Sequence, residues 1–212
     1  MIPEIELMID IETLGTKPGA PVLEIACVAF YLDGSPLVPG YGRLVEPYRI
    51  ALPLQSQLDR GLQIDADTLG WWTKEERAGR LYELMREGET RTQTVTSALG
   101  GLKHFIASHR AGDDRSICMW ANSPSFDLTL LEHLFRTYEI AVPWTHREQA
   151  DQRTWLRSVG CRSTRELGIP FVGTEHCALD DATHQIKLVQ EVYRRLHPNC
   201  PGDDRAKQHP ST

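Results

Sequence analysis

A short apolar run near the N-terminus ends in two carboxylates, and this run constrains the fold more than any other feature of the chain. Ile5 to Ile11 reads IELMIDI, and Glu12 follows directly. Alternate side chains of a strand point to one face, so Asp10 and Glu12 share a face while Ile11 packs on the other. Two carboxylates on one face of a buried strand need a partner for their charge, because burying an unpaired charge is costly.

The chemistry of that pair favours a divalent cation. Two neighbouring carboxylates repel one another unless a cation lies between them, and hard oxygen ligands suit Mg²⁺ or Mn²⁺. An Asp-x-Glu pair also occurs at solvated strand ends. The pair alone therefore leaves a metal site and a solvated strand end both open.

The remaining pattern predicts one α/β domain with a mixed sheet. Strands are expected at Ile5 to Ile11, Val22 to Tyr31 and Tyr41 to Val45, joined by short turns into an antiparallel meander. Helical periods then dominate, with one more buried strand between them. The expected later elements are helices at Thr68 to Arg77, Val95 to His109, Phe126 to Tyr138, Gln149 to Val159 and Ala178 to Leu196, and a strand at Ser116 to Ala121.

The composition fits one soluble domain. The chain has 212 residues, a net charge of −6 and 41% hydrophobic residues. No apolar run reaches the roughly 20 residues of a membrane helix, and no secretory signal is visible. Five scattered cysteines without a Cys-x-x-Cys pair argue against zinc or disulfide frameworks and for a cytoplasmic location. We expect residues 1–197 to form the domain and residues 198–212 a polar, flexible tail.

Two further segments carry groups suited to catalysis. Phe126-Asp127 opens a helix after the predicted strand and a Ser/Pro turn, and Asp127 there also suits the positive end of the helix dipole. His176 precedes the last helix, and Asp181 lies in its first turns. An imidazole titrates near neutral pH, as a general base requires, although a surface histidine beside helix-capping acids has the same pattern.

Together these segments resemble the DEDDh branch of the DnaQ-like 3′–5′ exonuclease superfamily, over roughly residues 5 to 196. The resemblance implies a ribonuclease H-like fold, with a mixed five-stranded sheet flanked by helices. It implies that four carboxylates bind two divalent cations, Mg²⁺ or Mn²⁺, and that His176 is the general base. The implied metal ligands are Asp10, Glu12, Asp127 and Asp181.

Four stretches of the sequence resemble one subgroup of this superfamily. The stretches Met8 to Thr16, Trp71-Trp72, Trp120 to Asp127 and Asp151 to Thr154 resemble the phage exonuclease A (DexA) type and its bacterial exoribonuclease-like relatives. Many superfamily members place an asparagine four residues before the second-motif aspartate. This chain has Ser123 there, with Asn122 one residue further away.

The resemblance also implies contacts to the terminal nucleotides. Leu14 is expected between the last two bases and Trp72 against a base, since single strands are commonly held by stacking on aromatic rings. Packing of Trp71 or Trp72 in the core is the competing interpretation. The expected nucleic-acid-binding residues are Ile11, Thr13, Leu14, Trp72, Phe126 and Arg153.

These observations predict a metal-dependent 3′–5′ exonuclease on single-stranded DNA, which releases nucleoside 5′-monophosphates. An exoribonuclease acting on RNA ends is the alternative, because the sequence does not reveal a contact to the 2′-hydroxyl. A non-catalytic nucleic-acid-binding module would not need all five site residues, and a polymerase proofreading subunit would favour an apolar docking tail. The expected binding partner is single-stranded nucleic acid, and no association with a membrane is expected. A homodimer stays open, because related enzymes include dimers.

Overall fold

A five-stranded mixed sheet in the order β3-β2-β1-β4-β5 forms the centre of the computed structural model. The structure describes residues 5–37, 45–90, 94–110 and 117–198. β1 pairs antiparallel with β2 and parallel with β4, β2 pairs antiparallel with β3, and β4 pairs parallel with β5. The strands are β1 (Glu6–Thr13), β2 (Val22–Phe30), β3 (Tyr48–Ala51), β4 (Cys118–Ala121) and β5 (Gln149–Asp151).

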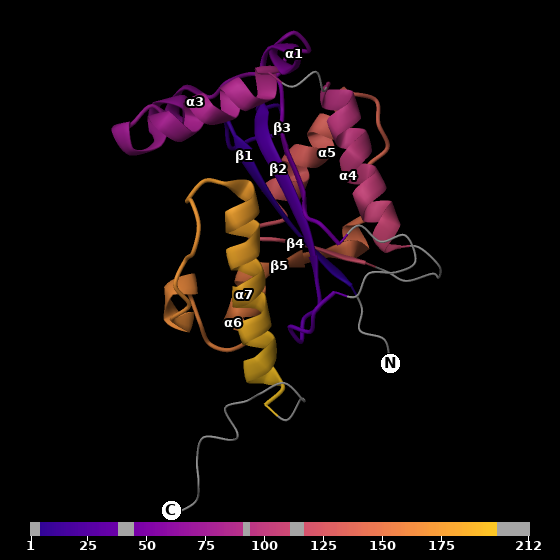
Figure 1. Cartoon of the computed structure of the whole chain (residues 1–212), viewed down its shortest axis with the longest axis vertical. Coiled ribbons are helices and arrows are strands. Elements are labelled where there is room, and N and C mark those ends of the chain that lie inside the picture. The colour runs from indigo at the N-terminus through magenta and orange to yellow at the C-terminus, as the bar shows by residue number, and fades with distance from the viewer. Residues whose placement is uncertain (1–4, 38–44, 91–93, 111–116, 199–212) are drawn as a thin grey trace, which may run out of the picture.

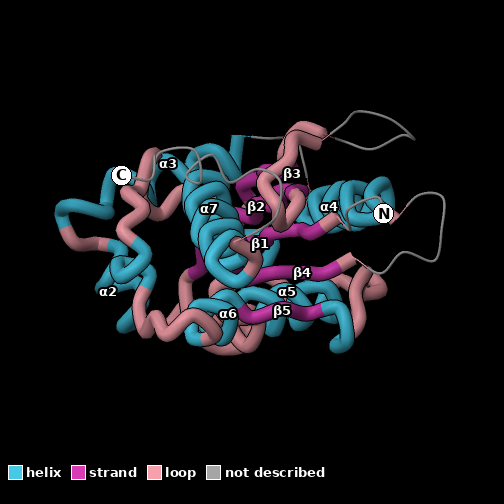
Figure 2. Tube along the Cα trace, turned by 90° about the horizontal axis from the view of Figure 1, so that it is seen from below, coloured by secondary structure: helices cyan, strands magenta, loops and turns pink. Residues whose placement is uncertain are grey.

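Helices cover both faces of this sheet (Figure 1). Figure 2 shows the strands as a layer between α7 on one side and α4 and α5 on the other. Among the described residues, no helix combines the length and the apolar character needed to cross a bilayer. The helices are α1 (Gln55–Leu58), α2 (Ala66–Trp72), α3 (Glu75–Thr90), α4 (Val95–His109), α5 (Asp127–Thr137), α6 (Gln152–Arg157) and α7 (Ala178–Leu196), with 3₁₀ turns at His146–Glu148 and Thr164–Leu167.

β1 places its carboxylates by simple alternation. Leu7, Ile9 and Ile11 belong to the main core cluster with the apolar residues of α4 and α5. Met8 packs on the opposite face with residues of α7. Asp10 and Glu12 continue that opposite face, as the strand period predicts. The end of β1 therefore presents two carboxylates on the face that packs against α7.

The described residues confirm the mixed five-stranded sheet and correct several boundaries. Most of the strand predicted at Tyr41 to Val45 lies outside the described residues, and the third strand of the meander is β3. The segment predicted as a helix at Gln149 to Val159 divides into β5 and α6, because three residues pair with β4 first. The tail predicted at 198–212 lies outside the described residues except for Pro198.

α3 is the largest element that the sequence pattern did not predict. The predicted helix at Thr68 to Arg77 ends at Trp72, and α3 begins anew at Glu75. Only Leu81, Leu84 and Gly88 of α3 are buried, so its apolar period is short. A Cβ at Gly88 would lie 2.3 Å from the carbonyl oxygen of Leu52, so α3 depends on a glycine to approach the sheet.

Candidate active site

The sheet topology brings four carboxylates to one cavity. β1 and β4 are parallel neighbours, and α5 begins with Asp127 after the turn that follows β4. α7 packs on β1 and β2 and contributes Asp181 from its first turn. The resulting cavity of about 570 Å³ is lined by Asp10, Glu12, Asp127, Asp181, His176, Gln185, Phe126, Arg153 and neighbouring residues. The structure thus brings together all five residues that were predicted to carry the chemistry.

Asp10 is buried at the cavity and held by a neighbouring amide. It is 9% exposed, and the Nε2 amide of Gln185 donates a hydrogen bond of 2.6 Å to its Oδ1 oxygen. The other amide atom of Gln185, Oε1, is buried without a hydrogen-bond partner among the described residues. Gln185 was not predicted from the sequence. It follows Asp181 by four residues on a helix, and this spacing could have placed it on the same face.

Burial raises the pKa of every one of the four carboxylates. The pKa of Glu12 rises to about 8, that of Asp127 to about 7 and that of Asp181 to about 6, with desolvation the largest cause in each. Desolvation and then the charges of Asp127, Glu12 and Asp181 hold the pKa of Asp10 well above its ordinary value. Four carboxylates in one cavity repel one another near neutral pH, and bound cations relieve that repulsion.

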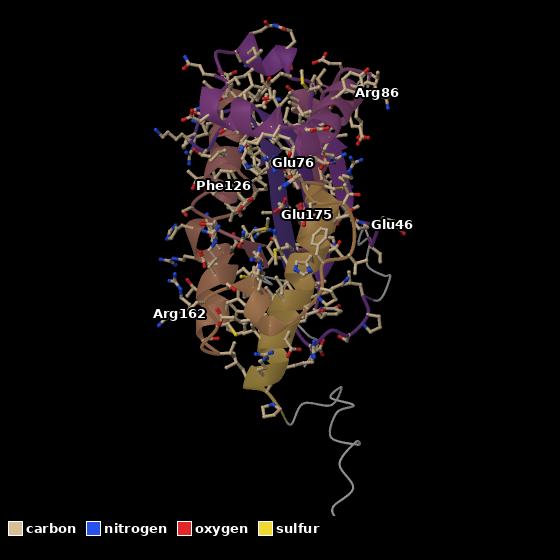
Figure 3. The ribbon with its side chains drawn as sticks, turned by 90° about the vertical axis from the view of Figure 1, so that its left-hand side faces the viewer. Glu46, Glu76, Arg86, Phe126, Arg162 and Glu175 are labelled. Atoms are coloured by element: carbon tan, nitrogen blue, oxygen red, sulfur yellow. The ribbon has the colours of Figure 1, made fainter. Side chains whose placement is uncertain are left out.

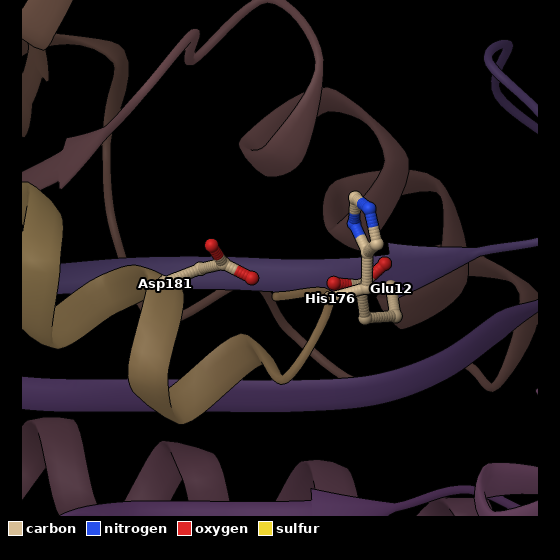
Figure 4. Close-up of side chains that lie close together, drawn as sticks. All are labelled: Glu12, His176 and Asp181. Atoms are coloured by element: carbon tan, nitrogen blue, oxygen red, sulfur yellow. The ribbon is translucent and has the colours of Figure 1, made fainter. Parts of the chain in front are cut away.

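The donor set fits a hard divalent cation. Ligand atoms of Glu12, His176 and Asp181 all lie within 4.8 Å of one another. Figure 4 shows the Asp181 carboxylate pointing toward Glu12 and His176. Carboxylate oxygens are the ligands that Mg²⁺ and Mn²⁺ prefer, and the unpartnered Gln185 Oε1 adds a free polar atom nearby.

His176 is held in an unusual backbone conformation. Its φ of 62° is rare for a residue other than glycine. The Nε of Arg80 donates a hydrogen bond of 2.9 Å to its carbonyl oxygen, and the Trp71 ring meets the imidazole edge to face at 4.8 Å. Burial lowers the pKa of His176, so its neutral form is favoured. Sequence reasoning missed Arg80, which carries no motif.

Polar residues beside Asp127 and Asp181 in the sequence make defined hydrogen bonds. The backbone N–H of Ser123 donates to Asp127 Oδ2 at 3.4 Å, while the Asn122 side chain accepts from Arg153 Nε at 3.4 Å. Asp180 is not among the residues that line the carboxylate cavity, and it accepts a hydrogen bond from the backbone N–H of Thr174 at 2.8 Å. Asp181 rather than Asp180 therefore lines the cavity.

A second cavity of about 570 Å³ adjoins the first and shares Ile11, Glu12, Thr16 and Phe126 with it. Leu14 and Trp72, predicted to touch bases, are each only 1% exposed and pack in a core cluster. The indole N–H of Trp72 donates to the carbonyl oxygen of Thr13 at 2.8 Å.

The burial of Leu14 and Trp72 limits the surface that they offer, and their contact with a base stays a prediction. Trp72 lines the second cavity although it is only 1% exposed, whereas Trp71, which lines the same cavity, is 37% exposed. Ile11 and Thr13 are also buried, at 5% and 6% exposed, although both line that cavity. Phe126 is half-buried and Arg153 is exposed at the edge of the carboxylate cavity.

Solved structures with the same fold include nucleases. The nuclease domain of 3′hExo, a DEDDh family member bound to rAMP, shares 13% identity over 94% of each chain, with a TM-score of 0.61. S. pombe Pop2p in its Mg²⁺ and Mn²⁺ bound form shares 11% identity over 96% of this chain and 87% of that one, with a TM-score of 0.57. E. coli Exonuclease I in complex with a 5cy-dA13 oligonucleotide shares 14% identity over 92% of this chain and 41% of that one, with a TM-score of 0.54. At these identities the likeness shows the ribonuclease H-like fold.

Sequence comparison gives the family directly. Among curated protein sequences, none matches the chain. Residues 5–193 match the family described as the 3′–5′ exoribonuclease Rv2179c-like domain. This match confirms the predicted exonuclease class, while closeness to the phage exonuclease A type stays a prediction. With this match over most of its length, the chain belongs to the Rv2179c-like family of 3′–5′ exoribonuclease domains.

Proposed function

We propose that this protein removes nucleotides from the 3′ end of single-stranded RNA and releases nucleoside 5′-monophosphates. The observation that carries the proposal is the convergence of four carboxylates and one imidazole in a single solvent-accessible cavity. The family's description as an exoribonuclease domain supports RNA. Single-stranded DNA, which the sequence analysis placed first, is supported by the Exonuclease I oligonucleotide complex of the same fold and is the second candidate.

Asp10, Glu12, Asp127 and Asp181 would hold two divalent cations, Mg²⁺ or Mn²⁺. When bound, such ions supply positive charge beside the attacking and departing oxygens of the phosphodiester. Pop2p of the same fold takes both ions, which supports this choice. Gln185 would fix the orientation of the Asp10 carboxylate through its amide N–H.

His176 is the general base in this proposal. Its lowered pKa favours a neutral imidazole, which can accept a proton from the attacking water. The water oxygen then forms a bond to phosphorus while the bond from phosphorus to the 3′ oxygen breaks. Arg80 and Trp71 keep the imidazole at the cavity by holding its backbone and its ring.

The direct test is degradation of two labelled strands of one sequence. We expect 5′-labelled single-stranded RNA to shorten from its 3′ end with Mg²⁺ or Mn²⁺ and to stay intact with EDTA or with Asp127→Ala. Faster loss of DNA than RNA would select the second candidate. A folded protein that degrades neither strand with either metal would overturn the proposed function.

A further inference from the structure

Four exposed arginines lie between residues 153 and 165, on α6 and the segment after it. Arg153, Arg157, Arg162 and Arg165, here called the arginine surface, form no ion pair with any described residue. Most of the other described arginines do pair with carboxylates, as Arg136 does with Glu132. The arginine surface therefore carries positive charge in a chain whose net charge is −6.

The carboxylates nearest to this surface in the sequence are engaged with the backbone. Asp151 caps α6 by accepting a hydrogen bond of 2.6 Å from the Thr154 N–H. Glu166 accepts hydrogen bonds from the backbone N–H groups of Arg162 and Ser163. These acids stabilise the turns that present the arginines and form no ion pair with them, while the charge of Arg153 acts on Asp127 in the cavity.

The arginine surface begins at the active site. Arg153 lines the carboxylate cavity and contacts Asn122 there. Arg157 follows one helical turn later, and it lines a separate cavity of about 520 Å³ together with Arg162, Gly160 and Cys161. In Figure 3, Phe126 at the carboxylate cavity and Arg162 lie along the same edge of the molecule, whereas Arg86 lies at the opposite corner.

The positions of the cavities relate the arginine surface to the path of a bound strand. Trp71 lines the second cavity, which adjoins the carboxylate cavity, and Arg153 lines the carboxylate cavity itself. A strand that extended from Trp71 across the carboxylates would reach Arg153 next. Its next phosphates then lie toward Arg157 and Arg162.

We infer that the arginine surface binds the phosphates upstream of the terminal nucleotide of a single-stranded nucleic acid. The inference rests on the proposed function, because the carboxylates mark where the 3′ end lies. Guanidinium groups bind phosphate through paired N–H donors and without regard to base sequence. Contacts of this kind release counterions, so they make affinity depend on salt and on strand length.

The test compares long and short strands on the full-length protein. Binding of 5′-fluorescent RNA is measured by anisotropy with Mg²⁺ in the Asp127→Asn background, with a 12-nucleotide strand and a dinucleotide. We expect Arg157→Ala/Arg162→Ala to weaken binding of the 12-mer about tenfold or more and to lower its log-log salt slope by about 0.7 per arginine. Dinucleotide binding should stay unchanged. Arg86→Ala on α3 is the matched control and should leave both affinities unchanged.

Two results would overturn the inference. Equal 12-mer affinity in the double variant and the Arg86→Ala control would show that the arginine surface does not contact the strand. An equal loss for the 12-mer and the dinucleotide would place the effect at the active site instead. Hydrolysis by the protein with native Asp127 is measured separately, so a failure of the proposed function appears as intact RNA and not as altered binding.

Discussion

Glu12 on β1 and Glu24 on β2 are direct neighbours across an antiparallel pair, and their surroundings differ completely. Glu24 is 0% exposed, forms ion pairs with Arg49 and Arg80, and accepts a hydrogen bond of 2.8 Å from the N–H of Ala178. Glu12 faces a cavity that it shares with three other carboxylates, and the charge of Arg80 offsets only part of their repulsion.

This difference distinguishes Glu24, which has a structural role, from Glu12, which is proposed as a metal ligand. Glu24 is neutralised by the protein itself, so it joins β2, α3 and the start of α7. The carboxylates of the cavity lack enough protein cations and require ions from solution. Arg80 links both groups, since one guanidinium nitrogen binds Glu24 and another donates to the His176 carbonyl.

The largest expected effect is a difference in exonuclease activity between substitutions of two adjacent aspartates, Asp181 and Asp180. Asp181→Asn should remove exonuclease activity to background, because it takes a charged ligand from the cavity. Asp180→Asn should retain most of the activity, since an amide oxygen can still accept the hydrogen bond from Thr174. Rates on labelled RNA, with circular dichroism to check folding, measure both. An active Asp181→Asn protein would contradict the assignment of this ligand.

The next effect tests the role of the imidazole. His176→Ala should lower the rate by about 10²–10⁴-fold, the usual contribution of one acid or base group. Titration calorimetry with Mn²⁺ should find metal affinity close to that of the unaltered protein. A large loss of metal affinity would instead make His176 a ligand, as its closeness to Glu12 and Asp181 also allows.

Substitutions of Glu24 and Glu12 should change the free energy of unfolding in opposite directions. Glu24→Gln should lower the free energy of unfolding by about 3–5 kcal/mol, because it removes the buried negative charge that Arg49 and Arg80 share. Glu12→Gln should raise the stability of the metal-free protein, because it removes a repelled carboxylate. Urea denaturation in EDTA at pH 8 measures both changes. Destabilisation of equal size in the two variants would break the comparison.

The smallest effect is a pH dependence of the metal-free protein. A carboxylate whose pKa is raised on folding holds a proton that the unfolded chain releases, so its contribution to stability is lost as pH rises through the folded value. Metal-free stability should therefore fall from about pH 5 to pH 8, as Asp181, Asp127 and Glu12 ionise with pKa values of about 6, 7 and 8.

Added metal should reverse that loss. Mn²⁺ at about 100 times its dissociation constant should add about 2.7 kcal/mol to the free energy of unfolding at pH 8. It should add less at pH 5, where protons compete with the ion for the carboxylates. Thermal and urea denaturation over this pH range measure both trends. Stability that rises with pH in EDTA would contradict the repulsion that we describe.

The sequence alone predicted the elements with strong periods and the residues of the three motifs. α4 and α7 occur at the predicted residues, since each combines a long apolar stripe with clear ends. Asp10 and Glu12 share a face because the strand period requires it. The sequence pattern missed α3, because a helix with few buried residues and two glycines leaves a weak apolar pattern.

The tertiary structure alone decided which roles and exposures chemically similar side chains have. Nothing local distinguishes Glu24 from Glu12, since the arginines that neutralise Glu24 come from β3 and α3. Likewise, the packing of α2 and α3 against the sheet buries Trp72 and leaves Trp71 exposed beside His176. Periodicity fixes the face on which a residue lies, but its charge partners and exposure depend on segments distant in the chain.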